Sequence, residues 1–416
     1  MRKLCLILLC LCLAIAPSCA SAGETITIVV ASDMHYLSPS LTDYGPSFME
    51  LLAAADGKMT HRTPEIMYAF AEEMIALGPD AVVLTGDLTL NGAPASHYDL
   101  DDILRPVEEA GIDVLVLPGN HDAGDPAYAF SEEESTKMIM SLGDNQFAGR
   151  YRQYGYTEAV SRDEVSASYV AAVGDHVRLL LIDSNCNDAE GWILPETFAW
   201  IEAQLADAQQ AGALVICATH QNVFQHSPLF ARGYVIGNGA YLAELLAKYG
   251  VPLNLSGHMH IQHIVQQDGV AEIATSSLAI APHQYGVITI TPDGAIHYET
   301  RVLDVSGWAQ RHGLTDPELL DFASASRSFF DIKTRSSAES RTEGLDITPE
   351  ERERMIALAV QVNGDYFAGC VSADYDKEAC DLWMTHCGET FYPAYLESMV
   401  SEAGVDMRTL TLPPRP

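Results

Sequence analysis

Basic residues are scarce in this chain. Its 416 residues include 23 Lys and Arg against 57 Asp and Glu, and the formal net charge is −34. So acidic a surface repels DNA, RNA and anionic membranes, which argues against a protein that binds along a nucleic-acid polymer. The sequence also lacks internal repeats, low-complexity tracts and heptads. It therefore predicts no coiled coil and leaves the oligomeric state open.

Long apolar runs are missing after the first 22 residues, so no membrane-spanning segment is expected there. The N-terminus itself has a basic start, an apolar run at residues 4–16 and small residues at positions 20–22, the pattern of a cleaved signal peptide. We therefore expect residues 1–22 to be removed and the mature protein to be secreted or extracytoplasmic. An uncleaved anchor and a lipoprotein are the alternatives. Stable membrane association is expected only if Cys19 is lipidated.

Cysteine is sparse in the mature chain, because four of the nine cysteines lie in the signal region. Cys186 and Cys217 lie in or beside strand-like runs and are expected to be buried thiols. Cys370, Cys380 and Cys387 lie near the C-terminus, where two of them can pair in an oxidising compartment, and the pairing is left open. Their spacing does not match a zinc-binding motif.

The remaining composition, 48% hydrophobic and 19% charged, is that of a globular protein. Up to about residue 304, short apolar runs alternate with amphipathic stretches, and hairpin-like runs with turn residues follow. This pattern predicts an α/β catalytic domain over residues 23–304, in which two sheets form a sandwich with helices outside. Helices are expected at residues 64–77, 94–110, 195–211 and 240–249.

Residues 305–416 have a different character. Helical patterns cover residues 315–330, 348–369 and 388–403, with a polar break at residues 334–343. The second pattern begins with Thr348, a favoured N-cap residue, and acidic residues follow in its first turn. We expect this segment to form a small all-helical C-terminal domain.

Five short polar islands follow the apolar runs of the first domain. They are Asp33-Met34-His35, Gly86-Asp87, Gly119-Asn120-His121-Asp122, His220 and Gly257-His258-Met259-His260. Side chains at the carboxyl ends of strands meet in one crevice of an α/β fold. Hard oxygen ligands mixed with imidazoles suit first-row divalent ions better than a closed structural zinc site. Gly86-Asp87 alone is a common end of a strand, whereas Gly119-Asn120-His121-Asp122 and Gly257-His258-Met259-His260 are more specific. The ordered set predicts a centre of two metal ions.

Individual roles follow from the side chains. Asp87 has two carboxylate oxygens and can bridge two ions at roughly 3.5–4 Å. Asn120 offers a neutral oxygen, and His220, His258 and His260 offer imidazole nitrogens. His121 follows a ligand and is spare, so it is the candidate proton donor to a leaving group. Asp122 is expected to orient the His121 ring.

The ordered set resembles the calcineurin-like metallophosphoesterases, whose motifs are all present between residues 25 and 302. The resemblance implies a four-layer α/β/β/α sandwich with two divalent ions of manganese, iron or zinc. One ion is then held by Asp33, His35, Asp87 and His260, and the other by Asp87, Asn120, His220 and His258. His121 matches the family's catalytic histidine. Within this family, Gly-Asn-His-Asp with a helical tail resembles secreted bacterial class III cyclic nucleotide phosphodiesterases.

The chain departs from the family in two places. Gln221-Asn222 follow His220, where many relatives have histidine and proline, so a contact around that ligand is expected to differ. Residues 36–62 are read as an inserted loop, which carries Lys58, His61 and Arg62. These three are candidates for holding a substrate phosphate or shaping recognition of a base, and the alternative is an ordinary solvated loop.

These observations predict an exported enzyme that hydrolyses phosphodiesters by attack of metal-bound hydroxide. A small phosphate ester, above all a cyclic nucleotide, is the expected substrate, and bound cations would offset the acidic charge locally. Two alternatives stay open. The motifs do not separate a phosphodiesterase from an extracytoplasmic phosphomonoesterase or nucleotidase. The chain can also be a non-catalytic binding protein with a vestigial metal site.

Overall fold

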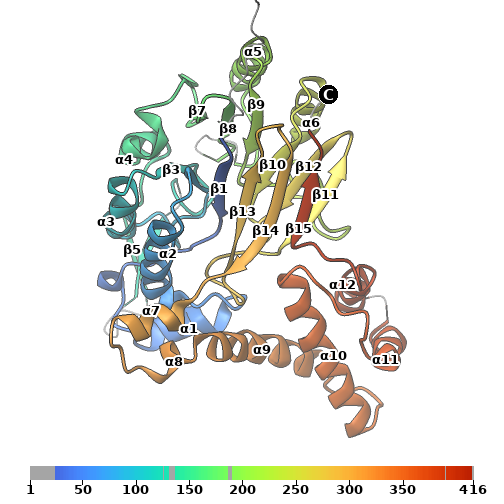
Figure 1. The fold of residues 1–416 in the computed structure, drawn as a ribbon. Helices are drawn as coiled ribbons and strands as arrows, with labels where there is room; N and C mark the ends of the chain where they lie inside the picture. Colours follow the sequence, from blue (N-terminus) through green and yellow to red (C-terminus); the bar gives the residue numbers. More distant parts are fainter. Residues whose placement is uncertain (1–23, 125, 131–135, 186–189, 389, 415–416) are drawn as a thin grey trace, which may run out of the picture.

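The computed structural model describes residues 24–124, 126–130, 136–185, 190–388 and 390–414 (Figure 1). The predicted signal peptide, with Cys19, and also Cys186 lie outside the described residues. No helix among those residues has both the length and the apolar character that crossing a bilayer requires.

The first sheet has six strands in the order β15-β14-β13-β1-β2-β3. Its strands are β1 Ile26–Ala31, β2 Ala81–Leu84, β3 Asp113–Val116, β13 Gln284–Ile290, β14 Ile296–Val302 and β15 Thr409–Leu412. β1, β2 and β3 run parallel, and β13 joins β1 antiparallel. All four residues of β2 are buried, as expected for a central strand covered on both faces.

The second sheet has seven strands in the order β11-β12-β10-β9-β8-β7-β6. They are β6 Ser161–Arg162, β7 Tyr169–Val173, β8 Val177–Leu181, β9 Leu214–Ala218, β10 Leu253–Ser256, β11 His263–Gln267 and β12 Val270–Ala274. β8, β9, β10 and β12 run parallel, and β7 and β8 form the hairpin that Gly174-Asp175 predicts. Two short antiparallel strands, β4 Ala127–Ala129 and β5 Lys137–Ile139, form a separate small sheet that belongs to neither of the two main sheets.

Helices cover the outer face of each sheet, which confirms the predicted α/β/β/α sandwich. The main ones are α2 Thr63–Leu77, α3 Pro94–Glu109, α5 Pro195–Ala211 and α6 Gly239–Lys248. Phe70 of α2 and Leu104 of α3 pack in one core with β1, β2 and β3. Ile201 of α5 and Leu245 of α6 pack in another with β8 and β9. Proline begins α3 and α5, where its missing N–H costs nothing.

The helical C-terminal region lies at one end of the sandwich (Figure 1). It contains α7 Val305–Arg311, α8 Pro317–Leu320, α9 Phe322–Arg341, α10 Pro349–Phe367, α11 Lys377–Cys387 and α12 Phe391–Val400. Trp383 and Leu396 are fully buried in its core. The chain then returns to the sandwich, because β15 pairs with β14. The C-terminal region, residues 305–416, which we also call the tail, therefore adds one strand, β15, that its sequence pattern did not predict.

Several local predictions differ from the structure. The polar break expected at residues 334–343 is wrong, because α9 continues to Arg341 and buries Phe322, Phe330 and Ala338 on one face. Packing of such a face stabilises a helix whose other side is polar. The insert at residues 36–62 is not only a loop, since it contains α1 Pro46–Ala54. A further short helix, α4 Phe147–Arg150, precedes β6.

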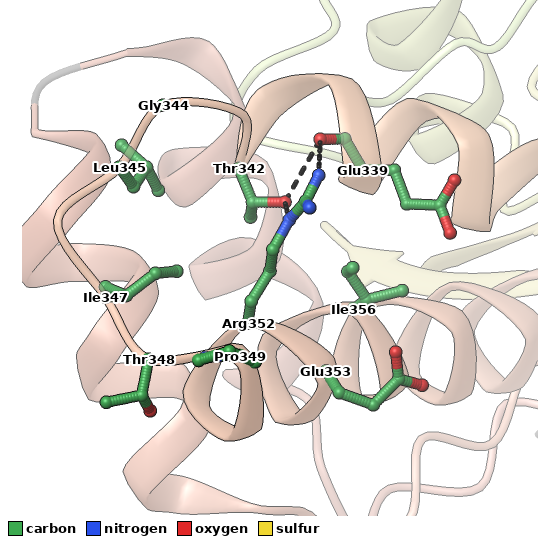
Figure 2. A pocket seen from close by; sticks show the side chains of 10 residues that line it. All are labelled: Glu339, Thr342, Gly344, Leu345, Ile347, Thr348, Pro349, Arg352, Glu353 and Ile356. Carbon is green, nitrogen blue, oxygen red and sulfur yellow. Dashed lines mark hydrogen bonds between the residues drawn. The ribbon is translucent and has the colours of Figure 1, made fainter.

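A hollow of about 530 Å³ lies between the end of α9 and the start of α10 (Figure 2). The Arg352 guanidinium donates to Thr342 Oγ1 at 3.2 Å and to the Glu339 carbonyl at 3.0 Å, so it satisfies acceptors at the end of α9. Among the described residues around this hollow, no group of His, Cys, Asp or Glu side chains is arranged to hold a metal ion. It is part of the tail's own packing.

Cys217, Cys370, Cys380 and Cys387 are free thiols in the described part of the chain. Cys217 is fully buried in β9, which confirms that prediction.

Candidate metal centre

The structure brings the predicted ligands together at the carboxyl ends of β1, β2, β3, β9 and β10. Two groups have candidate ligand atoms within 4.8 Å of one another, namely Asp33, His35, Asp87 and His260, and Asp87, His220 and His258. Asn120 Oδ1 lies 3.1 Å from His220 Nε2 and so joins the second group. Asp87 is common to both groups, which is the arrangement expected of a bridging carboxylate.

Backbone hydrogen bonds hold the strand-end loops in register. The Asp33 N–H donates to the Gly86 carbonyl at 3.1 Å, and the His35 N–H donates to the Asp87 carbonyl at 2.9 Å. The Gly257 N–H donates to the His220 carbonyl at 3.0 Å. Loops from neighbouring strands therefore fix one another, and the ligand positions depend on the sheets rather than on long flexible segments.

Five predicted ligands adopt backbone conformations that non-glycine residues rarely occupy. Their φ angles are positive: 54° at Asp33, 43° at His35, 49° at Asp87, 65° at His258 and 59° at His260. Such conformations each cost on the order of 1–3 kcal/mol and persist only where the surrounding structure enforces them. Concentration of this strain in one cluster indicates a site shaped by function.

Glycines in the islands allow the loops to approach closely. A Cβ on Gly119 would overlap the backbone nitrogen and Oδ1 of Asp87. A Cβ on Gly257 would collide with Ser32 Oγ and lie 2.6 Å from Asp33 Oδ2. Only glycine fits at these two positions, so Gly119 and Gly257 let the carboxylates lie against neighbouring backbone.

Hydrogen bonds to backbone carbonyls select which ring nitrogen of His220 and of His258 faces the centre. His220 Nδ1–H donates to the Thr85 carbonyl at 2.8 Å, which leaves Nε2 for a ligand. His258 Nε2–H donates to the Gly233 carbonyl at 2.8 Å, which leaves Nδ1. Outer partners of this kind fix the tautomer and the ring orientation of metal-binding histidines.

Two side-chain atoms of the predicted ligands are buried and lack a hydrogen-bond partner among the described residues. They are Asp33 Oδ1 and His35 Nδ1. Asp33 Oδ1 lies 3.4 Å from His260 Nε2 and 3.9 Å from His35 Nε2, so it faces other candidate ligand atoms. A buried carboxylate oxygen with no donor is costly unless a cation compensates it. This atom therefore fits a bound metal ion.

Protonation also suits coordination. Burial lowers the pKa of His258 to about 4 and holds the pKa of His35 well below its ordinary value. Burial would raise the pKa of Asp87, but the charges of His220 and His121 hold it well below its ordinary value. Burial acts against protonation of His220 too, but Asp87 raises the pKa of this ring to about 9. The ionised carboxylates and the neutral imidazoles of His35 and His258 suit divalent cations, and binding of a cation would displace the extra proton of His220.

His121 borders the centre without contributing a predicted ligand atom. Its Nδ1–H donates to the Leu90 carbonyl at 2.9 Å, and its backbone N–H donates to Asp87 Oδ1 at 2.9 Å. The ring lies edge-on to His35 with centroids 5.0 Å apart. Because Nδ1 is engaged, Nε2 is the nitrogen left to exchange a proton with a substrate.

The prediction that Asp122 orients the His121 ring is wrong. The Asp122 carboxylate instead accepts backbone N–H groups of Leu88 at 3.1 Å, Thr89 at 2.8 Å and Gly119 at 2.9 Å. It therefore holds the loop after β2 against the loop after β3. Burial and the nearby Asp87 charge raise the pKa of Asp122 to about 6 despite these donors. Its role is structural, and the Leu90 carbonyl orients His121.

The substrate candidates of the insert divide into two kinds. Arg62 donates to Glu318 at 2.6 Å and to Asp316 at 2.7 Å, and His61 Nε2 lies 3.4 Å from Glu318. These pairs tie the insert to the start of α8, so the structure does not support phosphate binding by His61 or Arg62. Lys58 differs, because its ion pair is with Asp56, a neighbour of the metal centre.

Gln221, which follows His220 where many members of the family have histidine, is a buried side chain that links neighbouring loops. Its Oε1 accepts from Ser184 Oγ at 2.6 Å, and its Nε2 donates to Asn185 Oδ1 at 2.5 Å. Asn185 Nδ2 in turn donates to the Pro118 carbonyl at 3.1 Å. The network steadies the loop that carries Asn120.

Asp56 is the residue that sequence reasoning missed. It lies in the insert, and its Oδ2 is 2.8 Å from Nδ1 of the predicted ligand His260. The one available signal is weak: Asp56 is the single acidic residue in the stretch of residues 51–62.

Two family models match the chain. The calcineurin-like phosphoesterase model matches residues 26–262, and a model described as the C-terminal domain of cyclic nucleotide phosphodiesterase matches residues 304–406. The first of these covers more than half of the sequence.

Named relatives match over the sandwich. A glycerophosphodiester phosphodiesterase of Enterobacter lignolyticus is 33% identical over 191 residues, and a probable cyclic nucleotide phosphodiesterase of Pseudoalteromonas is 26% identical over 187. Each alignment covers 44% of this chain and 56% of the relative, so the match spans about half the length of these relatives. A dimetal phosphatase structure from Danio rerio is 13% identical with a TM-score of 0.47, and the alignment covers 67% of this chain and 96% of that one.

Proposed function

Because the chain belongs to the calcineurin-like phosphoesterase family, we propose that it is a phosphodiesterase of small molecules, with cyclic nucleotides as its main substrates. The protein is a metal-dependent phosphoric ester hydrolase. The observation that carries the reaction type is the pair of ligand groups sharing Asp87. Support for the cyclic substrate comes from the match of residues 304–406 to the C-terminal domain of cyclic nucleotide phosphodiesterase.

The residues of the centre have separable tasks in this proposal. Two divalent cations would be held by Asp33, His35, Asp87 and His260, and by Asp87, Asn120, His220 and His258. When bound, such a pair polarises the phosphoryl group and activates water. Manganese, iron and zinc all suit this mixture of carboxylate, carboxamide and imidazole donors.

The chain's own proton chemistry is assigned to His121. Hydrolysis forms one P–O bond to water and breaks the ester P–O bond, and the departing oxygen requires a proton. Nε2 of a protonated His121 can supply it, while Nδ1–H stays bonded to Leu90 and keeps the ring in place. Lys58, which lies beside the predicted ligand region, is the insert residue that remains a candidate for contacting substrate phosphate.

A substrate panel tests the proposal. We expect the manganese-loaded mature protein to cleave 2′,3′- or 3′,5′-cyclic nucleotides faster than nucleoside monophosphates, and to cleave bis-nitrophenyl phosphate faster than nitrophenyl phosphate. Preferential release of phosphate from monoesters would replace the proposal with a nucleotidase. Absence of metal-dependent turnover on every ester of the panel would favour a binding protein.

We also propose that the protein is exported, on the basis of the signal-like pattern of residues 1–22. N-terminal sequencing of the product from cells is expected to give Gly23 as the first residue, and fractionation is expected to place it outside the cytoplasm. Recovery with membranes through a modified Cys19 would indicate a lipoprotein. An intact N-terminus in the cytoplasmic fraction would contradict export.

A further inference from the structure

The turn at residues 56–58 of the insert reaches the metal centre from outside the five islands. Nδ1–H of His260 donates to Asp56 Oδ2 at 2.8 Å. Nε2 of the same ring lies 3.0 Å from His35 Nε2 and 3.4 Å from Asp33 Oδ1, so it faces the other ligands. The contact with Asp56 therefore decides which nitrogen of His260 is presented.

We propose that Asp56 is a positioning residue for the metal ligand His260, and that Phe330 of the helical C-terminal region acts through Asp56. The inference rests on the two-metal centre of the proposed function. It assigns Asp56 no contact with substrate. Its consequence is that the tail helps to form the metal centre.

His260 differs from the other predicted histidine ligands in the chemistry of its outer partner. His220 and His258 donate to backbone carbonyls, and His35 Nδ1 has no partner among the residues described. A carboxylate partner carries full charge, so it makes the opposite ring nitrogen more basic than a carbonyl does. Loss of such partners typically lowers metal affinity by about 10- to 100-fold.

The Asp56 carboxylate is held at both oxygens although its side chain is 42% exposed. Lys58 Nζ lies 3.2 Å from Oδ1, while Oδ2 accepts from His260. The Met59 N–H then donates to the Ala279 carbonyl at 2.9 Å, which anchors the chain after the turn. These contacts fix the direction of the carboxylate without burying it. Replacement of Asp56 is therefore not expected to unfold the protein.

Phe330 of α9 fixes the turn from the other side. Gly57 has φ of 103°, and a Cβ at this position would lie 2.6 Å from Cδ2 of the Phe330 ring. Phe330 is buried with Ile280 and Ala281, and the partly buried Phe367 packs against them. The Phe330 ring therefore packs directly on Gly57. Gly57 lies between Asp56, which accepts from His260, and Lys58, which pairs with Asp56. Movement of α9 would displace the turn.

Metal titration tests the proposal without relying on activity. The metal-free full chain is titrated with Mn²⁺, and free manganese is measured by electron paramagnetic resonance. We expect the wild type to bind two ions and Asp56→Ala to weaken one of them by about 10- to 100-fold, with the other unchanged. Asp56→Asn keeps an acceptor without the charge and should fall between. Glu50→Gln, an exposed carboxylate of α1 in the same insert, is the matched control and should bind like the wild type.

The role of Phe330 is tested by Phe330→Leu and by the double variant with Asp56→Ala. If Phe330 acts through Asp56, the single Leu variant weakens the same ion, and the double variant binds no more weakly than Asp56→Ala alone. Additive losses would overturn that coupling. If Asp56→Ala binds both ions as tightly as the wild type does, the positioning role is overturned while the proposed function stands. Failure of the wild type to bind two ions would instead remove the premise of the proposed function.

Discussion

An Asp87→Ala variant is expected to lose both metal sites and nearly all hydrolysis. Asp87 belongs to both ligand groups, and it also accepts the backbone N–H of His121 at 2.9 Å. Removing one interaction with the transition state typically costs about 10²- to 10³-fold. Losing the shared carboxylate affects both cations, so we expect turnover of a cyclic nucleotide to fall by more than about 1,000-fold. Metal analysis after gel filtration and a turnover assay measure the two effects.

Two further variants separate metal loss from damage to the fold. Asp87 has a φ of 49°, a conformation that asparagine tolerates better than alanine, so Asp87→Asn keeps the backbone while reducing the charge. Asp102→Ala removes a carboxylate that is 69% exposed on α3 and should leave metal content and turnover unchanged. Two retained ions together with more than a tenth of wild-type turnover in Asp87→Ala would contradict the bridging role.

The candidate centre was predictable because each ligand directly follows a strand. A buried strand such as β2 has a clear apolar pattern, and its end is marked by Gly86-Asp87. Parallel strands place their carboxyl ends at the same edge, so the order of the islands determines their proximity. The structure brings all seven predicted ligands together, and metal binding by them stays a prediction.

The parts that sequence could not predict depend on contacts between distant segments. Asp56 is an exposed carboxylate 204 residues from His260 in sequence, and only the path of the insert brings them together. Asp122 follows His121 directly, but backbone donors from the loop after β2 turn its carboxylate away from the ring. β15 forms because β14 offers it an edge. No local pattern contains this information.

A His121→Ala variant is expected to keep both metal ions and lose turnover according to the leaving group. The ring contributes no predicted ligand atom, and the backbone N–H that bonds Asp87 is retained in alanine. A positioned proton donor contributes typically about 10²- to 10⁴-fold when the departing oxygen is strongly basic. We expect a loss in that range for cyclic nucleotides, whose leaving group is a ribose oxygen. For nitrophenyl esters the loss should be small.

The dependence on leaving group is what distinguishes a proton donor from a substrate-binding residue. A nitrophenolate departs without protonation, so a variant that lacks the donor should show rates that fall steeply as the basicity of the leaving oxygen increases. The wild type should show a weaker dependence across the same series of esters. If His121 only binds the phosphate, the variant loses the same factor on every ester, and the two series are parallel. Equal metal content in the two proteins, measured on the same samples, is the control that makes either result decisive.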